Sequence, residues 1–109
     1  MRKDRTMLAT IAGRTVHVND EGFLTEYGDW DEAVAAELAA DIGVALSEEH
    51  LEVIRFVRDD YAAEGVTPTL RRISTTGGVP LKRLFVLFPK KPAKKIAYVA
   101  GVPKPVGCV

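Results

Sequence analysis

The chain carries its longest helical pattern in the stretch Ser47-Glu48-Glu49-His50-Leu51-Glu52-Val53-Ile54-Arg55-Phe56-Val57-Arg58-Asp59-Asp60-Tyr61-Ala62-Ala63-Glu64-Gly65. Ser47 is a typical N-cap residue, and the two glutamates that follow it favour the positive end of a helix dipole. Gly65 can end the helix in a left-handed conformation. The apolar positions recur at helical spacing in a wide stripe, which comprises Leu51, Val53, Ile54, Phe56, Val57 and Tyr61. So wide a stripe predicts a central helix that packs on more than one side.

A β-hairpin is predicted near the N-terminus. Two short β-prone runs, Met7–Ile11 and Arg14–Val18, flank the turn residues Ala12-Gly13. The whole chain has 109 residues, which is the usual size of a single domain with one core. We therefore expect the hairpin to pack on the same core as the central helix.

One further helix is predicted between the hairpin and the central helix. Asp29 is a candidate N-cap, and Glu32 follows it at the spacing of a capping box. The helix should run to about Ile42 and end at Gly43, a residue type that commonly follows a helix C-terminus. Trp30 begins its apolar face, so we expect this side chain to anchor the core.

Prolines and glycines mark three more helices in the C-terminal half. Proline is tolerated in the first turn of a helix, whereas glycine and a later proline end one. The predicted helices run from the cap Thr67-Pro68 to about Thr76, from Pro80 to Phe88, and from Pro92 to Ala100. The fold class is thus α+β and mainly α, a small helical domain of about five helices with a helix-turn-helix-like part. We expect this domain to span residues 1–100.

The last nine residues, Gly101-Val102-Pro103-Lys104-Pro105-Val106-Gly107-Cys108-Val109, contain the only cysteine of the chain. Proline and glycine both disfavour helix, so we expect residues 101–109 to form a flexible, extended arm. At about 3.1 Å per residue, such an arm carries its tip about 25 Å from the body. Its hinge positions are expected at Gly101, Pro103, Pro105 and Gly107. A lone cysteine forms no internal disulfide, so Cys108 is either a reactive thiol or an incidental exposed one.

Four stretches resemble the DsrC/TusE family, whose members are sulfur-relay proteins related to the gamma subunit of dissimilatory sulfite reductase. They are Leu46–Asp59, Thr67–Arg71, Leu84–Lys94 and the C-terminal nine residues, in the order that the family has them. The resemblance implies that Cys108 accepts sulfane sulfur as a persulfide and passes it to a partner. It implies a sulfurtransferase-type carrier that acts only with a donor complex and an acceptor protein, without a cofactor.

Two departures from the family pattern bear on the function. Members that work with dissimilatory sulfite reductase have a second cysteine eleven residues before the last one, where this chain has Ala97. This favours the single-cysteine branch similar to TusE, which feeds sulfur through a tRNA thiolase toward 2-thiouridine in tRNA. The second departure is Lys91, where the family commonly has glycine. The alternative function is a non-catalytic gamma-type subunit or regulator that binds a sulfite-reductase-like enzyme or DNA.

Charge is distributed unevenly along the chain. Residues 1–64 hold all 15 acidic residues and six basic ones, whereas residues 65–109 hold nine basic residues and no acidic one. Such a basic half suits an acidic partner, an anionic substrate or nucleic acid, or it complements the acidic half within the fold. The residues that we expect to bind partners are Arg71, Lys90, Lys91, Lys94, Lys95 and Lys104. The alternative for them is a solvated basic face.

Other functional classes find less support in the sequence. Lys82 and Arg83 lie on the second helix of the helix-turn-helix-like part, but the apolar run Leu84–Phe88 indicates that this helix is mostly core. His17 and His50 lack companions at metal-ligand spacing, so no metal site is expected. No apolar run reaches the ~20 residues of a membrane span, and no signal peptide is evident. We therefore expect a cytoplasmic protein that docks to other proteins.

Overall fold

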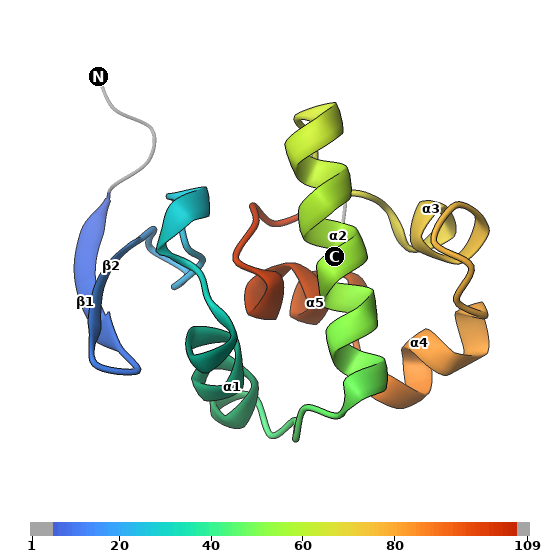
Figure 1. Ribbon diagram of the computed structural model, residues 1–109, viewed down its shortest axis with the longest axis horizontal. Helices are drawn as coiled ribbons and strands as arrows, with labels where there is room; N and C mark the ends of the chain where they lie inside the picture. Colours follow the sequence, from blue (N-terminus) through green and yellow to red (C-terminus); the bar gives the residue numbers. More distant parts are fainter. Residues whose placement is uncertain (1–5, 107–109) are drawn as a thin grey trace.

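The structure of the chain is a computed structural model that describes residues 6–106. Helix α2 (Glu48–Glu64) runs through its centre and packs against α5 (Pro92–Ala100) and α3 (Leu70–Thr75) (Figure 1). Ser47 caps α2 as predicted: its hydroxyl accepts from the His50 N–H, and the His50 ring accepts from the Ser47 N–H. Gly65 ends the helix at φ 80°. The central position predicted for this helix is therefore confirmed.

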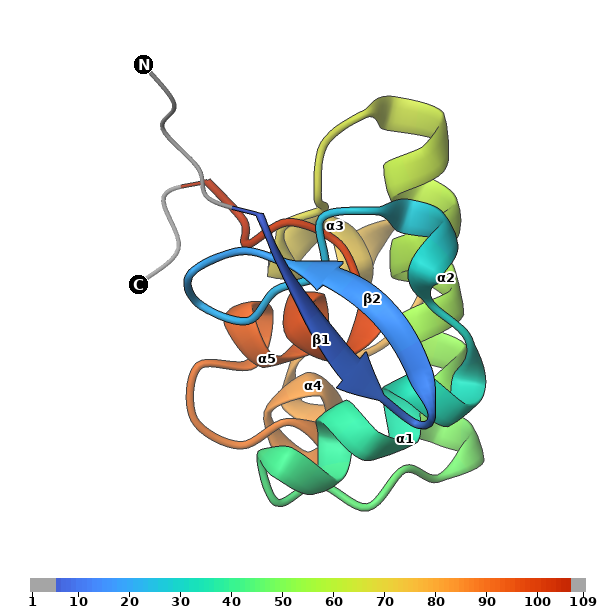
Figure 2. The ribbon, with the colours of Figure 1, turned by 90° about the vertical axis from the view of Figure 1, so that its left-hand side faces the viewer.

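The N-terminal hairpin has the predicted bounds. Strand β1 (Met7–Ile11) pairs antiparallel with β2 (Arg14–Val18), and the register places Met7 opposite Val18. Ala12 and Gly13 both have positive φ, 53° and 76°, as a two-residue hairpin turn requires. Val16 and Val18 point into the core, so the hairpin covers one side of the helical body (Figure 2).

Helix α1 (Glu32–Asp41) begins two residues later than predicted. Its N-cap is Asp31, whose carboxylate accepts from the Val34 N–H at 2.8 Å, so the assignment of Asp29 as the cap is wrong. Asp29 instead ends a short 3-10 turn, η1 (Tyr27–Asp29), and its carboxylate accepts the backbone N–H of His17 at 2.8 Å. The hydrogen bonds from the side chain and backbone of His17 lower the pKa of Asp29. Asp29 therefore joins the hairpin to η1 rather than starting a helix.

Helices α3 and α4 (Leu81–Leu87) form the helix-turn-helix-like part, and the predicted cap of the first is wrong as well. Thr69, not Thr67, caps α3 by accepting from the Arg72 N–H at 3.1 Å. Thr67 instead donates its hydroxyl to the carbonyl of Pro103 at 2.6 Å. Helix α4 begins after Pro80 and ends before Pro89, as predicted.

Helix α5 has the predicted bounds and packs against α1, α2 and α4. The core between them is made of aliphatic and aromatic side chains that are almost fully buried, among them Ile54, Leu84, Phe88, Ile96 and Val99. His50 links two of the helices, because its Nε2 lies 2.9 Å from the carbonyl oxygen of Leu87 at the end of α4. Within residues 6–106, no helix combines the length and the apolar character needed to cross a bilayer.

Candidate functional site

The predicted arm begins where α5 ends, and its described part, Gly101–Val106, is named the arm root here. Cys108 and Gly107 lie outside the described residues. We expected residues 101–109 to extend away from a body that ends at residue 100. The arm root instead packs partly on the body: Val102 is fully buried and Pro105 is buried as well, whereas Pro103, Lys104 and Val106 are exposed, Val106 at 99%. The last described residue, Val106, is thus exposed, two residues before the cysteine in the sequence.

The last four carbonyls of α5 are all hydrogen-bonded, although a helix terminus leaves four such groups without helical partners. The backbone N–H of Gly101 donates to the carbonyls of Ala97 and Tyr98, and the N–H of Val102 also donates to the Ala97 carbonyl at 3.2 Å. Two side chains from distant elements complete the set. The Trp30 Nε1–H donates to Val99 at 2.8 Å, and the Arg58 guanidinium donates to Ala100 at 2.9 Å. The end of α5 is thus fixed in position and direction.

Arg58 is the most unusual member of this set because it is a buried cation on the central helix. Only 9% of it is exposed, and burial lowers the pKa of its guanidinium. The group lies over the rings of Tyr27 and Trp30, 3.8 and 4.3 Å from their centroids, and also donates to the Tyr27 carbonyl. Its charge faces the C-terminal end of α5, where the helix dipole favours a cation. Arg58 therefore stabilises the point from which the arm root starts.

Gly101 is required at this point for two separate reasons. Its φ is 72°, in the left-handed region that favours glycine. A Cβ atom here would lie 2.7 Å from Cδ1 of Trp30 and 3.0 Å from Cδ1 of Leu24. Gly101, predicted as a hinge, thus lies in a bonded and tightly packed turn. Hinges at Pro103 and Pro105 stay predictions, since the first accepts the Thr67 hydroxyl and the second is buried.

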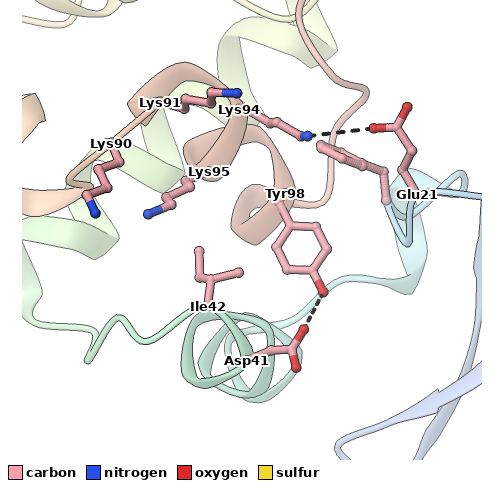
Figure 3. Close-up of a pocket in the computed structure, with 9 residues that line it drawn as sticks. Glu21, Asp41, Ile42, Lys90, Lys91, Lys94, Lys95 and Tyr98 are labelled. Carbon is pink, nitrogen blue, oxygen red and sulfur yellow. Dashed lines mark hydrogen bonds and ion pairs between the residues drawn. The ribbon is translucent and has the colours of Figure 1, made fainter. Parts of the chain in front are cut away.

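Four of the predicted partner-binding lysines surround one open hollow of about 530 Å³, named the lysine hollow here (Figure 3). Lys90 and Lys91 are exposed and precede α5, whereas Lys94 and Lys95 lie in its first turn and are half-buried. Lys104 joins the group from the arm root, because its Nζ lies 3.1 Å from the Glu21 carboxylate, which also lines the hollow. Arg71 lies on α3 and does not line it.

The second helix of the helix-turn-helix-like part presents a mainly apolar outer face. Leu81, Phe85 and Val86 are about half exposed. Arg83 forms a two-pronged ion pair with Glu49, which leaves Lys82 as the exposed cation of α4 that is in no ion pair between described residues. A surface of this kind is unlike the polar, cationic face with which proteins read a DNA groove.

Several residues of the site were not predicted from the sequence. Arg58 stands four residues after Ile54 and three before Tyr61, inside the apolar stripe of the central helix, and that position was the available signal for a buried cation. Glu21 and Thr67 gave no such signal, because their partners lie 83 and 36 residues away in the sequence. His17 and His50 have hydrogen-bonding roles in the fold. Among residues 6–106, no three His, Cys, Asp or Glu side chains are grouped to hold a metal ion.

Residues 6–106 form a hairpin packed on five α-helices, and the last helix ends in the arm root that precedes the cysteine. This arrangement defines a DsrC-type fold. The chain belongs to the DsrC-like protein family, because the family model described as DsrC like protein matches residues 10–109. Sulfurtransferase TusE from Salmonella typhimurium and from Escherichia coli is 38% identical to it over 104 residues, covering 89% of this chain and 95% of the relative.

Solved structures give the same family. The NMR structure of DsrC from Allochromatium vinosum superimposes with a TM-score of 0.81 at 34% identity, covering 96% of this chain and all of that one. A chain in the crystal structure of dissimilatory sulfite reductase I gives a TM-score of 0.82 at 35% identity, over 94% of this chain and all of that one. The resemblance stated from the sequence is confirmed, and the protein is a member of a family of sulfur-relay proteins.

Proposed function

We propose that this protein is a sulfur carrier that holds sulfane sulfur on Cys108 as a persulfide. The Cys108 thiolate attacks the terminal sulfur of a donor persulfide. A new S–S bond forms on Cys108, the S–S bond of the donor breaks, and the donor cysteine leaves as a thiolate. The same exchange, in reverse roles, delivers the sulfur to the acceptor. No external oxidant or reductant is needed, because the oxidised sulfur atom is itself the cargo.

The observation that carries this proposal is the anchored arm root. Trp30, Arg58 and Gly101 fix the end of α5, and the last described residue, Val106, is exposed. A reactive group two residues further on is then presented from a defined point on a stable body. A fixed root reduces the conformational freedom lost when the tail enters a partner, which favours binding.

The absence of a second cysteine favours transfer between proteins. With Ala97 in place of the second cysteine, Cys108 can form S–S bonds only with another molecule or with its own sulfur cargo. Ala97 is fully buried, and its carbonyl accepts from Val102 of the arm root. We propose that the acceptor is a tRNA thiolase, as implied by the likeness to TusE, and that sulfur ends in 2-thiouridine. A sulfite-reductase-like acceptor is the alternative, as the likeness to DsrC implies.

The deciding experiment is intact-mass spectrometry after incubation with a cysteine desulfurase and cysteine, and separately with polysulfide. We expect a gain of one sulfur that reductant removes and that the Cys108→Ser variant lacks. Failure with polysulfide, while Cys108 still reacts with an alkylating reagent, contradicts the carrier function. A gain with polysulfide alone supports carrier chemistry and indicates that a dedicated donor complex supplies the sulfur.

A further inference from the structure

The lysine hollow combines two kinds of surface in one place. Its rim is cationic: Lys90, Lys91, Lys94 and Lys95 line it, and the Lys95 ammonium donates to the Pro89 carbonyl at 2.6 Å (Figure 3). Its floor is formed by the ring of Tyr98 and the side chains of Ile42 and Phe23. A purely electrostatic docking patch would need the cations alone. The apolar floor beneath them therefore indicates a ligand that has an apolar part as well as negative charge.

The backbone before α5 holds the rim lysines in a costly conformation. Lys90 and Lys91 have φ values of 61° and 55°, so two successive non-glycine residues are left-handed. For an L-residue this costs about 1–2 kcal/mol each, and strain of this kind persists where the surrounding structure or the function requires it. Pro92 follows at once and starts α5. This tight turn places two exposed lysines beside the hollow, where a glycine would have made the turn without charge.

The charges around the hollow are not balanced within the chain. Five lysines (Lys90, Lys91, Lys94, Lys95 and Lys104) meet two carboxylates, those of Glu21 and Asp41, which leaves a formal excess of three positive charges. Glu21 lies 3.1 Å from Lys104 and 3.9 Å from Lys94, and so serves two cations. Asp41 is engaged with the Tyr98 hydroxyl at 3.0 Å. The excess is suited to carboxylates supplied by a partner.

The floor suits a side chain better than a nucleobase. Base stacking requires an exposed aromatic face. Phe23 is only 2% exposed, and Tyr98 is half-buried, with its hydroxyl held by Asp41 and its ring edge to face with Phe23 at a centroid distance of 5.4 Å. The remaining floor residue, Ile42, is aliphatic. The cations are lysines rather than arginines, so they supply point charges and lack the planar fork that binds phosphate with two parallel hydrogen bonds.

We propose that the lysine hollow binds an acidic segment of a partner protein that inserts one large apolar side chain between Tyr98 and Ile42. The proposal rests on the proposed carrier function, because it identifies the docking site beside the arm root. Carboxylates of the segment pair with the two exposed lysines on the rim, Lys90 and Lys91. The link through Glu21 to Lys104 places the docked segment next to the origin of the cysteine-bearing tail. A partner held there lies beside Lys104, which precedes Cys108 by four residues in the sequence.

Three fluorescein-labelled probes test this chemistry on the full chain under reducing conditions. The first is the peptide Gly-Asp-Glu-Leu-Asp-Glu-Gly, the second replaces its leucine with serine, and the third is a uridine hexanucleotide. Binding is measured by fluorescence anisotropy, and the footprint by amide shifts in NMR spectra. We expect the leucine peptide to bind about tenfold more tightly than the serine peptide, because a leucine side chain is buried. Shifts should centre on Ile42, Tyr98 and residues 90–95.

The variant pair Lys90→Glu and Lys82→Glu separates the hollow from general charge. Both change the net charge equally, but Lys82 lies on α4 and does not line the hollow. We expect Lys90→Glu to weaken the leucine peptide about fivefold, whereas Lys82→Glu leaves it nearly unchanged. A third variant, Ile42→Ser, should remove the preference for the leucine peptide over the serine peptide. Thermal unfolding of each variant checks that it folds.

Four results overturn the proposal: no binding of the leucine peptide, equal binding of the two peptides, tighter binding of the uridine hexanucleotide, or equal effects of the two lysine variants. Persulfide loading is measured on the same samples by intact mass. If Cys108 takes up sulfur from polysulfide but the hollow binds no peptide, only the docking proposal fails. If the peptide binds but Cys108 takes up no sulfur, the carrier function fails and the binding site stands.

Discussion

The two ends of α5 differ in almost every physical respect. At the C-terminal end, each of the last four carbonyls has a hydrogen-bond partner, and Gly101 packs against Trp30. At the N-terminal end, two strained lysines are exposed and the nearby charges are unbalanced. The first end is built for stability, whereas the second gives up stability to present charge. The C-terminal end of α5 thus holds the arm root, and its N-terminal end, nine residues earlier, holds the proposed docking surface.

The largest effect is expected from removing Arg58 at the stable end. Arg58→Ala leaves the buried carbonyl of Ala100 and the part-buried carbonyl of Tyr27 without their donor and should lower the free energy of unfolding by about 3 kcal/mol. The matched control is Arg55→Ala, one turn earlier on α2, where the lost ion pairs to Glu32 and Glu48 are exposed. That variant should cost far less, because exposed ion pairs contribute little to stability. Urea unfolding measures both, and equal losses would show that Arg58 does not anchor α5.

Close packing around Gly101 gives the next largest effect. Gly101→Ala combines left-handed strain with a Cβ atom 2.7 Å from Trp30, so we expect a loss of about 2–3 kcal/mol. Gly65→Ala has a similar φ, 80°, but nothing lies within 4 Å of the added atom. It should cost only about 1–2 kcal/mol, from strain alone. Thermal and urea unfolding of the two variants compare these costs, and a Gly101→Ala protein as stable as Gly65→Ala would contradict the tight packing at the arm root.

Much of this architecture follows from local sequence patterns, and the failures have a common cause. The hairpin, α2 and α5 were predicted at their observed bounds because turn residues, an N-cap and a proline acted without competition. Asp29 and Thr67 were wrong as caps because Asp31 and Thr69 satisfy the same local preference. Long-range contacts, to His17 and to Pro103, decided between the candidates.

The C-terminal segment shows the same limit. Its proline and glycine content correctly excluded a helix over the arm root, but composition does not reveal that Val102 fits into the core. Residues of the lysine hollow were named from charge alone, and nothing in their spacing predicted that Ile42 and Tyr98 would lie beneath them. The sequence indicates which chemical groups are available, whereas packing determines which of them meet.

Replacing Lys91 tests whether the left-handed turn before α5 lowers the stability of the protein. Lys91→Gly should raise the free energy of unfolding by about 1 kcal/mol, because glycine adopts φ 55° without the penalty of a side chain. The same variant should bind the acidic leucine peptide more weakly, since one rim cation is lost. Ala12→Gly, at φ 53° in the hairpin turn, relieves similar strain without changing charge or binding. If Lys91→Gly destabilises the chain in urea unfolding, the turn before α5 is not strained in the way described.

The smallest expected effect is on the ionisation of Tyr98, which forms part of the floor of the hollow and is measured by titration. Burial raises the pKa of Tyr98 to about 12, with a further contribution from the hydrogen bond and charge of Asp41. The neutral phenol is thus favoured by folding, so its contribution to stability is complete below pH 10 and is lost as the pH rises through 12. Ultraviolet absorbance should show a late tyrosine ionisation near pH 12, which Tyr98→Phe abolishes and Asp41→Asn moves to lower pH.

The peptide probes test the comparison at neutral pH, where lysine ammonium groups are charged. An apolar side chain seated on the Tyr98 ring should shift the NMR signals of the ring protons, which the Tyr98→Phe variant assigns. The serine peptide, which leaves the floor hydrated, should shift them less. Identical shifts with either peptide would mean that negative charge alone is recognised at the N-terminal end of α5. The two ends of α5 would then differ in stability and in charge, but the charged end would make no specific apolar contact with a partner.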